Sequence, residues 1–181
     1  MATDSTLLAS VEQLERQTEE GLPVATAEQL LEQASGVVRN HCRWRIDYAE
    51  NDELLVDAPR HGDALLLPSL RLLQVQSLTI GGVALTGFTH TLSGVLERRG
   101  GWPRGIVRAV VTHGWNPVPA EIRAVTIGVA LRMWLNPEAA ASYSLAGSTQ
   151  TVGSAGGGAG RSLGLLDTEI DMLDAYAVKV T

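Results

Sequence analysis

Apolar residues recur at helical spacing in two stretches near the start of the chain. Within residues 6–20, Leu7, Val11 and Leu14 lie three or four positions apart, with charged residues between them. Residues 26–44 repeat this arrangement over a longer stretch. Because a spacing of three to four residues places side chains on one face of a helix, both stretches are predicted to be amphipathic helices.

The pattern changes in the middle of the chain, where short apolar runs alternate with turn-forming residues. These runs predict strands at 54–57, 64–67, 71–80, 83–85, 95–96 and 106–113. Gly81 and Gly82 separate two of the runs, and two glycines can both adopt the positive φ that a tight hairpin requires. We therefore expect a small antiparallel sheet of four to six strands.

Residues 120–135 predict a third helix. Pro119 precedes them, and proline is favoured in the first turn of a helix because its missing N–H is not needed there. Asn136-Pro137 ends the pattern. Since nearly all of this segment is apolar, we expect it to lie at the centre of the core.

The composition then shifts to small residues. Residues 139–162 are rich in Gly, Ser, Ala and Thr, and too few apolar side chains are present to offset the entropy of ordering them. We interpret this segment as a flexible arm. A last short helix is predicted from Asp167, with Ile170, Leu173 and Tyr176 at helical spacing.

These elements predict an α+β protein. Its fold class would be mainly a helical bundle of three main helices, with a small antiparallel β-sheet and a flexible C-terminal arm that ends in a short helix. We expect two parts, a helix–sheet–helix core in residues 1–138 and the C-terminal arm in residues 139–181.

Composition and charge narrow the class of protein. Of the 181 residues, 45% are hydrophobic and 19% are charged, which is typical of a soluble globular protein. The net charge of −6 argues against wrapping of DNA, because proteins that grip phosphates are usually basic. Cys42 is the only cysteine, so no intrachain disulfide can form. We expect no signal peptide and no membrane span.

Catalytic and metal-binding motifs are not expected. The four histidines do not form an HExxH pair, and no GxSxG sequence is present. Ala155 to Ser162 resembles a phosphate-binding loop only superficially, because an alanine replaces its first glycine and Arg161 its lysine. The acidic residues of the last helix could bind a cation, but a solvated helix face explains them better. The prediction is no enzyme, no cofactor and no metal.

Four short motifs, in order, resemble the head–tail connector (head-to-tail adaptor) proteins of tailed bacteriophages that infect actinobacteria. The motifs are Glu28–Ser35 with Val38-Arg39, Val107–His113 with Gly114-Trp115 and Pro117–Pro119, Asn136–Ala140 with Ser142 and Leu145–Gly147, and Leu166–Glu169 with Leu173 and Tyr176. The resemblance runs from about Leu7 to Tyr176. It departs from the family in the longer glycine run at 156–158, and the strands between 50 and 104 match only in pattern.

The resemblance implies a structural virion protein at the head–tail interface, made in the cytoplasm of the bacterial host. Such subunits form a homo-oligomeric ring of roughly a dozen copies. The ring binds the portal protein on one side and a tail stopper or head-completion protein on the other, and DNA passes through its channel without specific binding. Alternatives are another tail-completion protein of the virion and, less favoured, a small hydrolase.

Two segments are candidate contact sites. The C-terminal arm is expected to contact the portal or a neighbouring subunit through Leu145, Gly147, Gly156, Gly157, Gly158, Arg161, Leu165, Leu166, Ile170, Leu173 and Tyr176. Its last helix is too short to be stable alone, so it either packs on its own domain or docks on a partner.

The second candidate is the loop that carries Arg98, Arg99, Trp102 and Arg104. Three interpretations stay open for this loop. It could contact a neighbouring subunit or the channel, form a solvated hairpin tip, or touch DNA, because basic residues interleaved with an aromatic suit nucleic acid.

Overall fold

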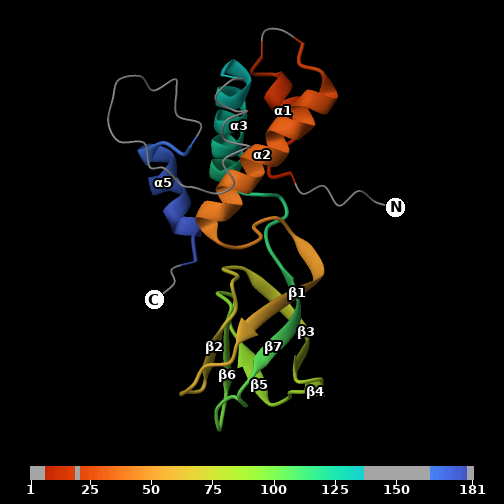
Figure 1. Cartoon of the computed structure of the whole chain (residues 1–181), viewed down its shortest axis with the longest axis vertical. Coiled ribbons are helices and arrows are strands. Elements are labelled where there is room, and N and C mark those ends of the chain that lie inside the picture. Colours follow the sequence, from red (N-terminus) through yellow and green to blue (C-terminus); the bar gives the residue numbers. More distant parts are fainter. Residues whose placement is uncertain (1–6, 19–20, 137–163, 179–181) are drawn as a thin grey trace. The chain divides into compact units, whose positions relative to one another are not determined.

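The predicted helices and strands separate into two units. The computed structural model describes residues 7–18, 21–136 and 164–178. Its helical unit lies within Met1–Cys42 and Val118–Tyr176, and its sheet unit lies within Arg43–Pro117 and Ala177–Thr181 (Figure 1). In the sequence, residues 43–117, which carry all the strands of the sheet unit, are therefore an insertion between two parts of the helical unit. The predicted division at residue 138 and the predicted arm at 139–162 lie outside the described residues.

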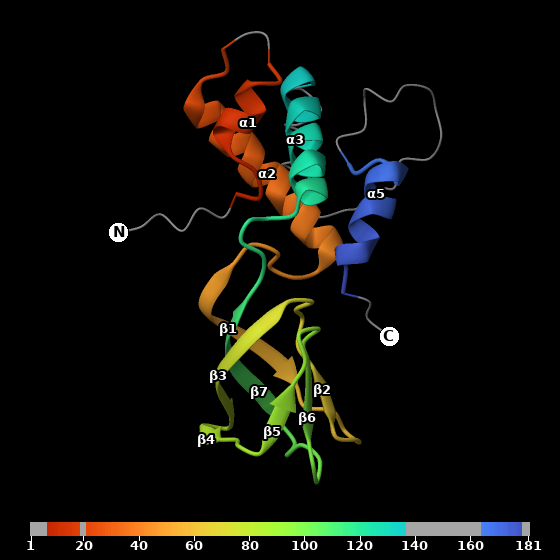
Figure 2. The ribbon, with the colours of Figure 1, turned by 180° about the vertical axis from the view of Figure 1, so that it is seen from behind.

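Four α-helices and one 3₁₀ helix are described in the helical unit. They are α1 (Val11–Glu15), α2 (Val24–Cys42), α3 (Ala120–Leu135), α5 (Asp167–Leu173) and the 3₁₀ helix η1 (Asp174–Tyr176). The long helices α2 and α3 pack on each other, and both α1 and α5 contact the two of them. Figure 2 shows α5 beside this pair from the opposite side.

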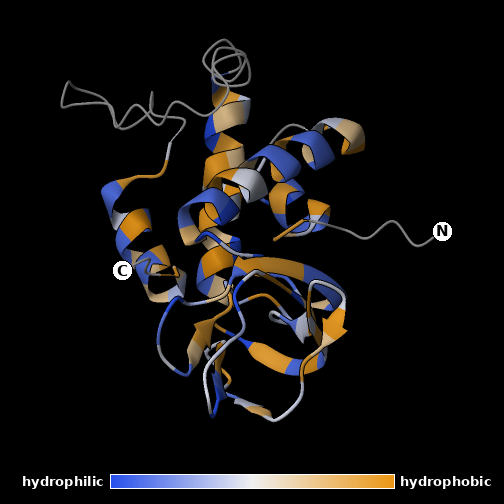
Figure 3. Ribbon diagram, turned by 60° about the horizontal axis from the view of Figure 1, so that its bottom comes forward, coloured by the Kyte–Doolittle hydropathy of each residue, from blue (hydrophilic) through white to orange (hydrophobic). Residues whose placement is uncertain are grey.

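The apolar faces of α1, α2 and α3 meet in the core of the helical unit. The helices carry bands of both hydrophobic and hydrophilic residues (Figure 3), so each can bury one side and solvate the other. Nearly inaccessible side chains in this core are Leu14, Ala27, Leu31, Ala34, Val38, Ile122, Val129, Ala130 and Met133. Residues 120–135 therefore contribute one face to this core, but they are not buried all round as predicted, because Leu135 is exposed.

The helix predicted over residues 6–20 is much shorter in the structure. Ser10 is the N-cap of α1, where its hydroxyl accepts a hydrogen bond from the Gln13 backbone N–H and the Gln13 side chain accepts one from the Ser10 N–H. The helix therefore begins at Val11, after Leu7, the first of the apolar residues that suggested it. The N–H of Leu8 instead donates to the Ser35 hydroxyl at 3.0 Å.

Seven strands form two antiparallel sheets in the sheet unit. They are β1 (Ala49–Asp57), β2 (Ala64–Leu66), β3 (Leu72–Ile80), β4 (Val83–Ala84), β5 (Phe88–His90), β6 (Val95–Arg98) and β7 (Ile106–His113). One sheet has the order β1-β7-β3-β4 and the other has the order β2-β6-β5. The hairpin predicted at Gly81 and Gly82 is confirmed, with φ of 56° and 81° and Ile80 paired with Val83.

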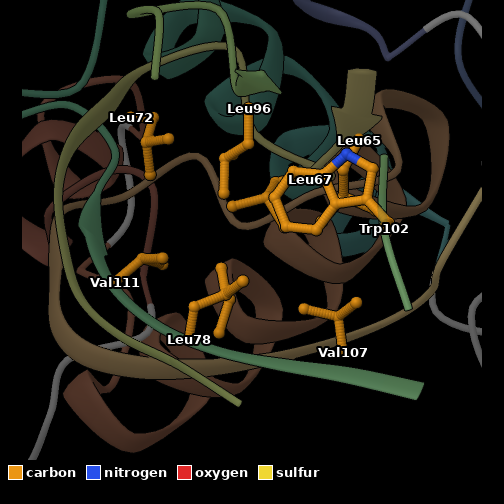
Figure 4. Close-up of a cluster of buried hydrophobic side chains, with 9 residues drawn as sticks. Leu65, Leu67, Leu72, Leu78, Leu96, Trp102, Val107 and Val111 are labelled. Atoms are coloured by element: carbon orange, nitrogen blue, oxygen red, sulfur yellow. The ribbon is translucent and has the colours of Figure 1, made fainter. Parts of the chain in front are cut away.

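Side chains of both sheets meet in a separate hydrophobic core (Figure 4). The buried members are Leu65, Leu67, Leu72, Leu78, Leu96, Trp102, Val107, Ala109 and Val111. Trp102, from the segment between β6 and β7, lies among leucines of the smaller sheet, and its indole N–H donates to the Asp63 carbonyl at 2.8 Å. The indole thereby fills apolar space while its polar atom is satisfied.

The predicted fold class is wrong in its main feature. Within the described residues, helix and strand content are about equal, two antiparallel sheets replace the single small one, and only α2 and α3 are long helices. The physical reason is that residues 43–117 have enough buried apolar side chains to build a core of their own. Several strands have only two to four residues, and such short runs give a weak periodic signal in the sequence.

Candidate functional site

The C-terminal helix α5 is held on α2 and α3 by one buried apolar side chain. Leu173 is fully inaccessible, and its carbonyl lies 4.0 Å from the Cys42 sulfur. Leu165, Leu166, Ile170 and Tyr176 are only half-buried. The predicted apolar stripe of this helix is thus real, but a single residue of it is completely covered within the helical unit.

A bidentate ion pair adds a polar attachment between α3 and α5. The Arg132 guanidinium donates to both carboxylate oxygens of Glu169, at 2.9 and 2.6 Å, and the two side chains are only 14% and 12% exposed. The same carboxylate accepts the Leu166 backbone N–H at 2.9 Å, which caps the start of α5. Gly128 leaves room for the pair, since a Cβ there would lie 3.3 Å from a Glu169 oxygen.

The far end of α5 and η1 carry further polar contacts. The His41 ring on α2 lies 2.9 Å from the Asp174 carboxylate, and the Tyr176 hydroxyl donates to Glu121 at 3.3 Å. Burial, with a smaller contribution from the nearby Asp174 charge, raises the pKa of the Cys42 thiol to about 12. Burial and Glu121 also raise the pKa of Tyr176.

We call the residues that receive this helix the α5 seat: His41, Cys42, Glu121, Gly128 and Arg132. The remaining candidates of the C-terminal arm, which are Leu145, Gly147, Gly156, Gly157, Gly158 and Arg161, lie outside the described residues. The seat is not apparent from the sequence, because Arg132 and Glu169 are 37 positions apart and neither belongs to a local motif. A weak local signal is Glu169 at the third position of the helix, from which its carboxylate accepts the Leu166 backbone N–H, although Leu166 cannot complete a capping box.

The basic loop after β6 divides into buried and exposed residues. Trp102 belongs to the core of the sheet unit, and the Arg98 guanidinium donates to the Gly101 carbonyl in its own loop. Arg99 and Arg104 are exposed. Of the four residues proposed for contacts, these two present their charges to solvent.

Arg104 also borders an open hollow in the surface of the sheet unit. The hollow has a volume of about 640 Å³ and is lined by Asp57, Ala58, Arg60, Arg104, Gly105 and Ile106. Arg60 follows β1 in the turn that leads to β2, and no sequence motif indicates its place in this hollow. The hollow places two arginines beside one carboxylate and the exposed Ile106 side chain.

Residues typical of metal binding are dispersed in the part of the chain that the structure describes. No group of three or more His, Cys, Asp or Glu side chains there could hold a metal ion. Among the same residues, no helix is long and apolar enough to cross a membrane. His113 is fully buried, and its ring nitrogen lies 2.9 Å from the Asp52 carboxylate, a pairing that ties two strands together.

Comparisons with known proteins give a match in fold. No family model and no curated protein matches the sequence. A chain from the neck of a native GTA (gene transfer agent) particle, computed with C12 symmetry, has a TM-score of 0.61 and 15% identity, over 100% of this chain and 94% of that one. A chain from the neck of an empty GTA particle, computed with C6 symmetry, has a TM-score of 0.64 and 15% identity, over 100% and 95%. Over its whole length, therefore, this protein shares the fold of chains found in the necks of phage-like particles.

Proposed function

We propose that the protein is a structural subunit of the neck of a phage-like particle, where it assembles with copies of itself into a ring. One observation carries this proposal: the fold match to neck chains spans the entire chain and nearly all of each matched chain. Both matched structures were computed with rotational symmetry. Head-to-tail contacts between identical subunits close into such rings.

The distribution of polar groups supports a binding role over a catalytic one. Two buried ionisable pairs connect elements of the fold to one another: Arg132 with Glu169 connects α3 to α5, and His113 with Asp52 connects β7 to β1. Exposed cations such as Arg60, Arg99 and Arg104 lie instead on the surface of the sheet unit. A ring gains avidity because many such modest contacts act together.

We further propose an adaptor position, between a portal protein and a tail stopper or head-completion protein. The ordered motifs that resemble phage connectors favour this position, and roughly a dozen copies would surround the DNA channel. The net charge of −6 suits a channel through which DNA passes without binding, because like charges repel. The C-terminal segment would reach the portal or a neighbouring subunit, and Arg99 and Arg104 would contact a neighbour or the channel.

The test is reconstitution with the cognate particle. We expect purified protein, added to particles that lack it, to join them at the portal as a ring visible by electron microscopy, and then to permit binding of the stopper. Attachment to the tail end alone would identify a tail-completion protein instead. Failure to join any part of the particle would refute a neck function.

A further inference from the structure

The connection between α3 and α5 is much longer than the packing of α5 requires. Its two described ends both contact Arg132: the Asn136 backbone N–H donates to the Arg132 carbonyl at 3.1 Å, and the Arg132 guanidinium donates to the Gly164 carbonyl at 3.3 Å. A few residues would span that separation. Residues 137–163 could instead extend to roughly 90 Å, at about 3.3–3.6 Å per residue.

The contacts of α5 with its seat are few, and all of them could form equally between α5 of one copy and the seat of another. They comprise the buried Leu173, the pair of Arg132 with Glu169, the pair of His41 with Asp174 and the hydrogen bond from Tyr176 to Glu121. A helix of seven residues is not stable alone in water, so α5 requires a seat. Every copy of the chain offers the same seat, and α5 of another copy would make the same contacts there.

We propose that, in the assembled protein, α5 of each copy occupies the α5 seat of the neighbouring copy. This inference rests on the self-association stated in the proposed function, and it names a second copy of this chain as the molecule whose seat receives α5. The surplus length of the connection supplies the reach, and exchange of identical elements in one direction closes into a ring. Within such a ring, the tether holds each α5 at high effective concentration near its neighbour's seat.

Charge reversal of the buried ion pair tests this exchange. Arg132→Glu places two acids at the contact, and Glu169→Arg places two bases there, so each variant alone is expected to lose ring assembly. In a mixture of the two variants, residue 132 and residue 169 carry opposite charges only when they belong to copies of different variants. We expect mixing to restore mixed rings, measured by light scattering and native mass spectrometry, and the double variant Arg132→Glu/Glu169→Arg to assemble alone.

Shortening the connection tests the same proposal with the native contacts retained. A variant with eight Gly/Ser residues in place of 137–163 can still seat α5 on its own copy but cannot reach a neighbour. We expect it to remain monomeric under conditions in which the wild type forms rings. The control replaces the same segment with a Gly/Ser sequence of unchanged length, which should assemble.

The outcomes separate the two proposals. If the shortened variant forms rings as well as the wild type does, or if the mixed charge variants recover no assembly, exchange of α5 is refuted while the neck function stands. If the wild type itself forms no ring, with or without portal, the proposed function fails first and exchange fails with it.

Discussion

Burial decides the chemistry of individual residues in this fold, and Cys42 is the clearest case. A lone cysteine in the sequence excluded an intrachain disulfide, but the sequence alone did not reveal its environment. In the structure, Cys42 ends α2 beneath Leu173, without solvent exposure. Burial therefore favours the neutral thiol. Because the thiol pKa is higher in the folded than in the unfolded protein, the free energy of unfolding depends on pH.

This coupling predicts a loss of stability in alkaline solution. Below the ordinary thiol pKa of 9.0, Cys42 is protonated in both states and the contribution is fully present. As the pH rises from 9 towards about 12, the unfolded thiol ionises while the folded one does not, so the free energy of unfolding falls. Denaturant titrations at pH 8 to 10.5 should show a steeper decline for wild type than for Cys42→Ala, and equal slopes would contradict the burial of this thiol.

At the scale of single elements, close approaches of the backbone set the turns of the sheet unit. Gly94 lies before β6 with φ of 81°, and a Cβ there would lie 2.3 Å from the Ser69 carbonyl oxygen. Gly100 has a similar φ of 89° but nothing within 4 Å. A residue with a Cβ would therefore be strained by the left-handed backbone at either position. Only at Gly94 would that Cβ also collide with a neighbouring backbone atom.

Replacing each of these two glycines with alanine should separate the free-energy cost of the left-handed backbone from the cost of the collision. We expect Gly100→Ala to destabilise the protein by about 1–2 kcal/mol, the cost of a left-handed conformation for a residue with a Cβ. Gly94→Ala should cost about 1–3 kcal/mol more, because the backbone near Ser69 must shift. Urea unfolding of both variants measures the difference, and equal free energies of unfolding would show that the turn relaxes freely.

Local elements were predictable and their assembly was not. The strand at 106–113 and the helix at 120–135 have the bounds that the sequence pattern indicates, because each carries its signal within a continuous apolar run. The short strand at 88–90 gave no such signal, and its place in the fold depends on pairing with β6. Trp102 was predicted to be a contact residue and is instead buried. No local pattern indicates this burial, because it depends on leucines distant in the sequence.

At the scale of the whole molecule, the chain enters and leaves the sheet unit side by side. The Trp115 backbone N–H donates to the Ile46 carbonyl at 2.8 Å, and the Tyr48 N–H donates to the Trp115 carbonyl at 3.2 Å. Gly114 allows this approach, since a Cβ there would lie 2.2 Å from the Asp47 oxygen. Such closely spaced ends are typical of an inserted unit that folds by itself. Sequence patterns do not reveal this insertion, because α2 and α3, which pack on each other, are separated in the sequence by all the strands of the sheet unit.

Residues 43–117 should therefore fold when expressed alone. Their ends are already paired, and their nine-residue core lies entirely within the segment. We expect a β-type circular dichroism spectrum, dispersed amide resonances and a cooperative thermal transition, with a modest stability because so small a unit buries little surface. Gly94→Ala in the same segment should lower its melting temperature, since Ser69 and Gly94 both belong to it. A random-coil spectrum for the unsubstituted segment would mean that the sheets depend on the helical unit, and that the insertion is not an independent domain.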